Sequence, residues 1–281
     1  MNRGSFCVFL AGQRPLFSLN KVRPFSSRVF PDMSVKETAA DVNDVPRDDE
    51  SKDTLTILGF GSLLSERSAR TTFPDLQHFR LGRLPGYRRV FAHPADIFFQ
   101  RGIACLATKQ MSSLSVEPCE GASCIVSVFD VPNKDVMEDG IPSRAFLERE
   151  AEFDIVSAPY YELDQESSQF SIHPKDGIVC KRSTDEAFIQ RWGEDYFKNA
   201  YGRYGIDTIW GWSEDSGLRP CAVYLRHCYL AAKCMGDDCL RSFLNDTFLV
   251  DRKTTVCEYL LEYPEVLETQ PPPELAERYG G

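Results

Sequence analysis

A short glycine loop near residue 60 has the residue types and spacing of a ligand-binding turn. The apolar run 54–58 stops at Gly59 and Gly61, which are one residue apart. Glycine permits unusual backbone angles and lets a ligand approach the main chain closely. The run therefore predicts a strand that ends in a tight turn, whose amides can bind a carboxylate or an oxyanion. The substrate-binding residues predicted from this turn are Phe60, Gly61, Ser62 and Leu63.

The loop alone also fits an ordinary turn at the end of a strand. It lacks the third glycine of a dinucleotide fingerprint and the Gly-Lys-Ser/Thr of a P-loop, so both nucleotide-binding interpretations fail. A second chemical group is needed before the loop indicates a function.

Glu150 is the candidate for that second group. A helix is predicted from Arg144 to Phe153, and helical spacing places Glu150 on the apolar face with Phe146, Leu147 and Phe153. Apolar surroundings raise the pKa of a carboxyl group and suit it to proton transfer near neutral pH. Glu148 and Glu152 would project to the other, solvated side. The alternative is that Glu150 lies at the edge of the face and pairs with a base such as Arg144 or Arg149.

The charge of the chain is unevenly distributed. The 281 residues carry a formal charge of -10, but residues 1–31 hold five arginines and lysines and no acid. Subtracting these five from 32 basic residues leaves 27 against 42 acidic residues, a charge of -15 for the rest. An acidic body argues against nucleic acid and anionic membranes as main partners. No apolar run is long enough to span a bilayer.

The first 53 residues are predicted to lie outside the folded part. The basic head is rich in Arg, Ser and Phe, which is typical of a cleavable transit peptide for a plastid or mitochondrion. A disordered tail on a cytoplasmic protein is the alternative. Residues 41–53 are polar and acidic and predict a disordered linker.

Neither a metal site nor a cofactor is expected. The ten cysteines contain no Cys-x-x-Cys pair, and none of the four histidines has the spacing of a zinc site. Reduced cysteines in apolar stretches behave as small buried hydrophobes. The pairs 119/124 and 234/239 could instead be redox-active.

Strand signals dominate residues 54–182, and helical spacing dominates residues 183–281. Strands are expected at 55–58, 79–91 with a Pro85-Gly86 turn, 102–108, 122–131, 155–163 and 170–180. Helices are expected at 186–201, 221–235, 238–248 and 251–261, with Asp251 as N-cap and an aromatic loop at 210–212. Strands with few intervening helices favour an α+β fold built on a small mixed β-barrel or curled sheet. We therefore predict a β-rich domain over 54–182, followed by a helical extension with a Pro-rich tail.

Several motifs, in order, resemble the γ-glutamyl cyclotransferase-like superfamily. Residues 59–63, Gly-Phe-Gly-Ser-Leu, resemble its Tyr-Gly-Ser-Leu loop, and residues 84–91, Leu-Pro-Gly-Tyr-Arg-Arg-Val-Phe, resemble its Gly-Tyr-Arg strand. Residues 101–106 look like the next strand. Residues 147–150, Leu-Glu-Arg-Glu, are similar to its Leu-Asp-x-Arg-Glu segment, whose last Glu is the acid/base. Tyr160 and Tyr161 fall near its tyrosine-bearing strand, and the extension is similar to the tails of plant and algal members.

This resemblance implies cyclisation of a small-molecule γ-glutamyl substrate to 5-oxoproline with release of the amine, and it needs no cofactor. Glu150 would be the acid/base and residues 60–63 would bind the substrate or the oxyanion. Phe60 replaces the usual Tyr and removes any hydroxyl contact there. The alternative function is a catalytically silent γ-glutamyl-binding or regulatory module on the same fold.

Overall fold

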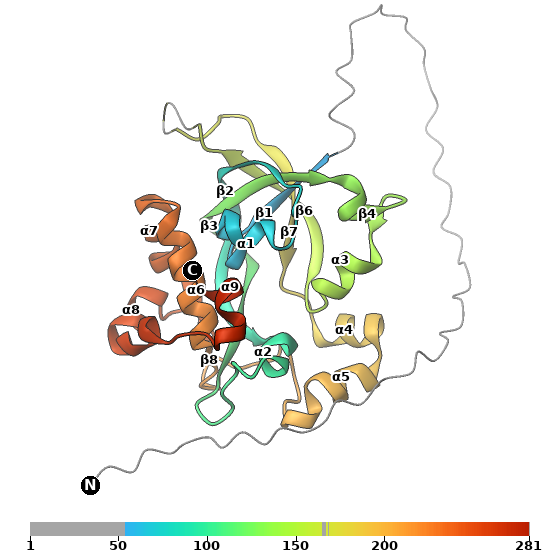
Figure 1. The fold of residues 1–281 in the computed structure, drawn as a ribbon, viewed down its shortest axis with the longest axis vertical. Helices are drawn as coiled ribbons and strands as arrows, with labels where there is room; N and C mark the ends of the chain where they lie inside the picture. The colour runs from blue at the N-terminus through green and yellow to red at the C-terminus, as the bar shows by residue number, and fades with distance from the viewer. Residues whose placement is uncertain (1–53, 165–166, 168, 281) are drawn as a thin grey trace, which may run out of the picture. The chain divides into compact units, whose positions relative to one another are not determined.

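The structure, a computed structural model, describes residues 54–164, 167 and 169–280, which belong to one compact unit (Figure 1). The predicted leader and linker, residues 1–53, lie outside the described residues. Secondary structure is mixed, with helices flanking a seven-stranded sheet. The α+β class predicted from the sequence is therefore confirmed.

Five strands of the sheet close into a mixed barrel. They are β1 (Thr54–Gly59), β2 (Gln77–Pro94), β3 (Gln110–Pro132), β6 (Asp154–Glu162) and β7 (Lys175–Lys181). Their order is β3-β1-β7-β6-β2, and the β2–β3 pairing closes the ring. Within that ring β7 runs parallel to β1 and, at one residue pair, to β3, whereas the other pairings are antiparallel. Two short strands extend it: β8 (Arg219–Pro220) beside β3, and β9 (Thr247–Leu249) beside β2.

Two strand predictions were wrong. Pro85-Gly86 does not turn the chain, because β2 continues along β3 on both sides of it. Gly86 adopts a left-handed φ of 73° at a shift in the strand register, so the pair forms an irregularity within the strand. Residues 102–108 form turns, with one isolated bridge from Cys105 to Gln110.

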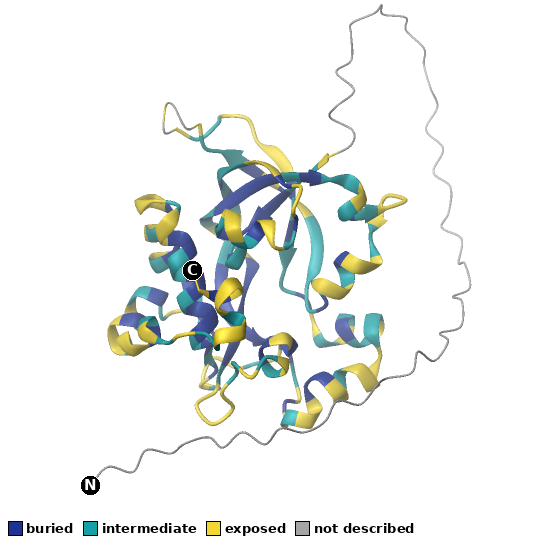
Figure 2. Ribbon diagram, viewed as in Figure 1, coloured by how far each residue is buried: buried dark blue, intermediate teal, exposed yellow. Residues whose placement is uncertain are grey.

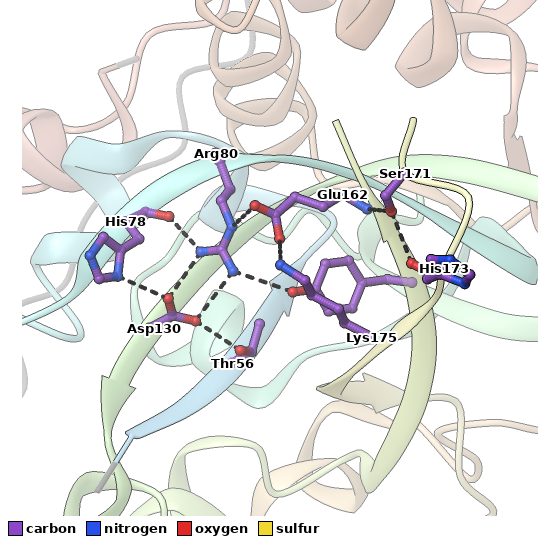
Figure 3. Close-up of polar contacts among 9 residues, drawn as sticks. Thr56, His78, Arg80, Asp130, Glu162, Ser171, His173 and Lys175 are labelled. Atoms are coloured by element: carbon purple, nitrogen blue, oxygen red, sulfur yellow. Dashed lines mark hydrogen bonds and ion pairs between the residues drawn. The ribbon is translucent and has the colours of Figure 1, made fainter. Parts of the chain in front are cut away.

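A chain of polar contacts links all five barrel strands (Figure 3). Arg80 of β2 forms ion pairs with Asp130 of β3 and Glu162 of β6, each at 3.1 Å. Thr56 of β1 donates to Asp130, and Lys175 of β7 pairs with Glu162 at 2.6 Å. The network fixes the register of the barrel at this end.

Helices occur in all five predicted ranges with shifted ends, whereas the first, second and last α-helices of the described residues were not predicted. They are α1 (Glu66–Arg70), α2 (Asp96–Gln100), α3 (Arg144–Arg149), α4 (Asp185–Trp192), α5 (Glu194–Ala200), α6 (Ala222–Cys234), α7 (Asp237–Asn245), α8 (Val256–Glu262) and α9 (Ala276–Tyr279). The helix predicted over 186–201 is broken at Gly193, whose φ is 91°. The last residues of the helix predicted over 238–248 belong to β9 instead, where they pair with β2.

The N-cap predicted for α8 was also wrong. Thr255 caps the helix, and its side chain and that of Glu258 form a reciprocal capping box. Asp251 instead accepts hydrogen bonds from the amides of Lys253 and Thr254 in the turn before the helix.

The extension shares its core with the barrel. Leu64, Phe91 and Leu114 from the first half pack in one buried cluster with Leu225 and Phe243 of α6 and α7. Figure 2 shows the buried residues along the strands and through α6. The residues after Arg182 thus help to build the site described below.

Candidate active site

The predicted loop and Glu150 line the same cavity, although they are far apart in the sequence. The cavity has a volume of about 600 Å³, and its walls include residues 57–63, Phe146 and residues 148–153 as well as residues of α2. This volume is within the usual range for small-molecule sites. Phe60, Gly61, Ser62, Leu63 and Glu150 are all part of its lining.

The loop is held by close contacts that require glycine. A Cβ at Gly59 would lie 2.4 Å from Ser127 Oγ, and a Cβ at Gly61 would lie 2.8 Å from the Tyr224 hydroxyl. The Ser127 hydroxyl donates to the carbonyl of Leu63 at 2.8 Å, and the amide of Leu64 closes the turn on Gly61. Among the described residues, the amides of 60–63 have no hydrogen-bond acceptor. They are therefore free to bind an anionic group of a ligand.

Glu150 occupies the C-cap of α3 rather than the interior of a longer helix. The predicted helix to Phe153 was too long, because Glu150 leaves the helical conformation with a ψ of 39°. The Glu150 side chain is 16% exposed, and its Oε1 forms an ion pair with Arg149 Nε at 3.0 Å. The Arg149 guanidinium lies 4.6 Å from the ring centre of Phe73, which fixes its position. The predicted alternative, an ion pair with Arg149, thus occurs within the cavity.

Glu152 was wrongly predicted to be solvated. Its Oε1 accepts hydrogen bonds from the Tyr201 hydroxyl at 2.6 Å and the Asp96 amide at 3.3 Å, and both acids line the cavity. Burial raises the pKa of Glu152 and of Asp96. The pKa of the Tyr201 hydroxyl is raised well above its usual value by burial and then by the Glu152 charge. The hydroxyl therefore stays protonated and donates. No helical spacing indicates this arrangement, since the three residues come from separate elements.

Several other cavity residues come from the extension and were not predicted. They include Tyr196 of α5, Tyr224 and His227 of α6, and Arg278 and Tyr279 of α9. The position of Tyr224 follows from the packing of α6 on the loop, which local sequence does not reveal. Tyr160 and Tyr161, suggested by the resemblance, are absent from the lining. Tyr160 instead accepts from Arg80 in the polar network of the barrel.

The aromatic loop at 210–212 packs into the core and does not line the cavity. Trp210 is 3% exposed and stacks on His93 with ring centres 4.2 Å apart. Its indole N–H donates to the Glu152 carbonyl at 3.0 Å, so the loop supports the cavity wall from behind.

Thiol chemistry has little support in the cavity. Cys180 lies beside Glu150, and burial followed by the Glu150 charge raises the pKa of its thiol well above the usual value. The thiol stays protonated and is a poor nucleophile. The nine cysteines of the described residues are free, and no group of three metal-ligating side chains occurs among these residues. None of the helices in the described part is long and apolar enough to span a membrane.

Comparisons with known proteins give matches among solved structures. No family model and no curated protein matches the chain. A yeast γ-glutamyl cyclotransferase specific to glutathione matches at 12% identity and a TM-score of 0.40, covering 77% of this chain and 96% of its own. Another γ-glutamyl cyclotransferase matches at 10% identity and a TM-score of 0.31, covering 53% and 86%. An uncharacterized human protein matches at 11% identity and a TM-score of 0.31, covering 53% and 87%.

These matches concern the fold over part of the chain. Two of the three structures bear the name of the superfamily that the sequence motifs resemble. At 10–12% identity and TM-scores of 0.31–0.40, they show neither an activity nor a substrate for this chain.

Proposed function

We propose that the protein is a γ-glutamyl cyclotransferase, which converts a γ-glutamyl compound to 5-oxoproline and releases the attached amine. One observation carries the proposal: Glu150 and residues 60–63, whose backbone amides have no acceptor among the described residues, line one cavity of small-molecule size. The amides supply an anion-binding group and Glu150 supplies a proton acceptor.

The reaction needs only these two elements. Glu150 takes a proton from the α-ammonium group of the substrate, and the neutral amine attacks the γ-carbonyl carbon. The carbonyl oxygen becomes an oxyanion as the ring C–N bond forms. Glu150 returns this proton to the departing nitrogen, and the original amide bond breaks. The ring nitrogen loses its second proton to the released amine, so the products are 5-oxoproline and the amine in its ammonium form. Proton transfer by a positioned carboxylate contributes about 10²–10⁴-fold to such a rate.

The loop amides would bind the substrate carboxylate or the developing oxyanion. Because the attack is intramolecular, holding the glutamyl chain in a folded conformer supplies much of the acceleration. The apolar side chains of Phe60 and Phe146 in the same lining limit water around the reacting atoms.

The test is release of 5-oxoproline from a panel of γ-glutamyl peptides and γ-glutamyl amines by the full-length protein. Glu150→Gln keeps the size of the side chain and removes the base, so we expect kcat to fall by about 10²–10⁴-fold. Glu194→Gln in α5 is the matched control, because the Glu194 side chain is 70% exposed, is paired with Lys198 and is absent from the cavity lining. Full activity in Glu150→Gln would exclude Glu150 as the acid/base.

A catalytically silent binding module is the second candidate, and two features favour it. Glu150 is already paired with Arg149, and Phe60 removes the hydroxyl usual in the resembled family. This candidate predicts that wild-type protein binds a γ-glutamyl peptide in calorimetry yet releases no 5-oxoproline from any member of the panel. Turnover that depends on Glu150 would exclude it.

A further inference from the structure

Two arginines at one side of the cavity carry positive charge without an acidic partner. Arg101 follows α2 and Arg278 lies in α9, and both line the cavity. Their guanidinium carbons lie over the Tyr279 ring, 5.5 and 5.8 Å from its centre. Arg101 also donates to the Tyr279 hydroxyl at 2.9 Å. Within the described part of the chain, neither guanidinium forms an ion pair.

Each of the four acids that line the cavity has a partner other than these two arginines, and Glu148 pairs with Arg144 at 2.6 Å. The Glu150 carboxylate pairs with Arg149, and Glu152 accepts from Tyr201. Asp96 accepts from Gln100 at 2.6 Å. The carboxylates of the cavity therefore form no ion pair with Arg101 or Arg278, and both guanidinium groups can bind an anionic ligand.

A buried histidine beside these arginines also lacks a hydrogen-bond partner. His227 of α6 is 2% exposed and lines the cavity, with its ring edge-on to Tyr279 at 5.6 Å. Neither of its ring nitrogens forms a hydrogen bond within the described residues. Burial, followed by the charges of Arg278 and Arg226, lowers the pKa of His227 to about 4, so the ring is neutral at pH 7. An unpaired buried polar group is costly unless a ligand or water satisfies it.

We propose that Arg278, Arg101 and His227 form a carboxylate-binding subsite of the cavity. The arginines supply charge, and neutral His227 supplies one N–H donor. The identity of the ligand rests on the proposed function, because a γ-glutamyl substrate has a carboxylate on its glutamyl group and a γ-glutamyl peptide has another on the released part. Guanidinium groups suit either one, since they bind carboxylates with charge-assisted hydrogen bonds.

The structure offers a matched control for the arginines. Arg219 of β8 lies 4.8 Å from the ring centre of Tyr263 and donates to its hydroxyl at 3.2 Å. This pair repeats the Arg101–Tyr279 arrangement but is absent from the lining of the cavity. Arg219→Gln therefore removes an equivalent arginine without touching the proposed subsite.

The experiment is calorimetric binding to the full-length Glu150→Gln protein, which keeps the ligand intact. The probes are γ-glutamyl-alanine, its C-terminal amide and its α-amide at the glutamyl carboxylate. In this background we expect Arg278→Gln to weaken binding of γ-glutamyl-alanine about 10-fold. Arg278→Lys should recover part of that loss, and Arg219→Gln should change binding less than about 2-fold. Melting temperatures should be unchanged, since Arg278 makes no hydrogen bond within the described residues.

The two amides identify which carboxylate is bound. If the subsite binds the carboxylate of the released part, Arg278→Gln should not change binding of the C-terminal amide, which lacks that carboxylate. It should weaken binding of the α-amide as much as binding of γ-glutamyl-alanine. The reverse pattern assigns the glutamyl carboxylate. Equal binding of every probe by the parent and Arg278→Gln proteins, or no binding of any probe by the parent, would overturn the subsite. If binding depends on Arg278 but the wild-type protein shows no turnover, the proposed activity is contradicted and the subsite is supported.

Discussion

At the scale of single residues, Gly61 shows how tightly the glycine loop packs against the helical extension. A Cβ at Gly61 would lie 2.8 Å from the Tyr224 hydroxyl, and Tyr224 itself is 9% exposed and packed between Phe91 and Phe98. The ring has little room to retreat, so an added methyl group must displace the loop. The shape of the anion-binding turn thus depends on a residue of α6.

We expect Gly61→Ala to raise KM for a γ-glutamyl substrate, with a loss of stability of about 1–3 kcal/mol from overpacking. Tyr224→Phe removes the hydroxyl that the new methyl group would meet, so the double variant should recover part of both losses. Steady-state kinetics and urea unfolding measure the two effects. Gly202→Ala is the control, because the nearest heavy atom to its Cβ would be 3.7 Å away. An unchanged KM in Gly61→Ala would show that the loop does not bind substrate.

The loop and Glu150, which the structure places in one cavity, could be selected from the sequence because each has a local signal. Two glycines after an apolar run and a glutamate at helical spacing from Phe146 are visible in a few neighbouring residues. Glu152 was misjudged because the same spacing rule says nothing about Tyr201, which reaches it from another element. No local sequence signal identifies Arg278 and His227 as cavity residues, because they are brought together only when α9 packs against α6.

At the scale of elements, ion pairs of Glu117 connect four segments of the fold. Its side chain on β3 is 8% exposed and pairs with Arg88 of β2 at 2.7 Å. It also pairs with Arg182, which follows β7, and with Arg252, which follows β9, each at 3.2 Å. Burial alone would raise the pKa of Glu117, but Arg252 and then Arg88 lower it below the usual value of 4.5. The carboxylate is therefore ionised and stabilises the junction of the barrel with the extension.

We expect Glu117→Gln to lower the free energy of unfolding by about 3–5 kcal/mol at pH 7, because three partly buried guanidinium groups lose their counter-charge. A lowered native pKa means that this contribution is present above the pKa of the unfolded state and is lost as the pH falls through the lower native value. The difference between wild type and variant should be constant above about pH 5 and should shrink below about pH 4.5.

Chemical denaturation at a series of pH values measures this difference. Glu66→Gln is the control, since Glu66 and Arg70 form an ion pair with both side chains 47% exposed. Such a pair contributes only about 0.3–0.5 kcal/mol. A Glu117→Gln variant no less stable than Glu66→Gln would show that the cluster does not stabilise the junction.

Element boundaries were less predictable than element types. The strands at 55–58 and 155–163 have apolar residues in a short bounded run, and the structure places β1 and β6 there. Pro85-Gly86 was wrongly predicted to form a turn because the dipeptide indicates only a local backbone preference. In the structure, pairing with β3 on both sides of the dipeptide keeps the chain in one strand. Likewise, residues 247 and 248 continue a helical pattern in the sequence, but they pair with β2 as part of β9.

At the scale of the whole molecule, the sheet and core run across the boundary predicted at residue 182. Strands β8 and β9 lie in the extension yet pair with β3 and β2, and Tyr224 and His227 complete the cavity. Leu64 and Leu114 share one buried cluster with Leu225. Neither half can lose its partner without exposing part of this core to water.

We therefore expect residues 54–280 to unfold in one cooperative transition. Hydrogen exchange in α6 and α7 reports on the extension, whereas tryptophan fluorescence reports on both halves, because Trp210 stacks on His93 of β2. Hydrogen exchange in β6 and β7 reports on the barrel. In urea titrations of the full-length protein both exchange probes should give the same midpoint, as a two-state transition requires. Two separated midpoints would mean that the halves are independent domains joined at residue 182, and the cavity would then depend on how those domains dock rather than on a single fold.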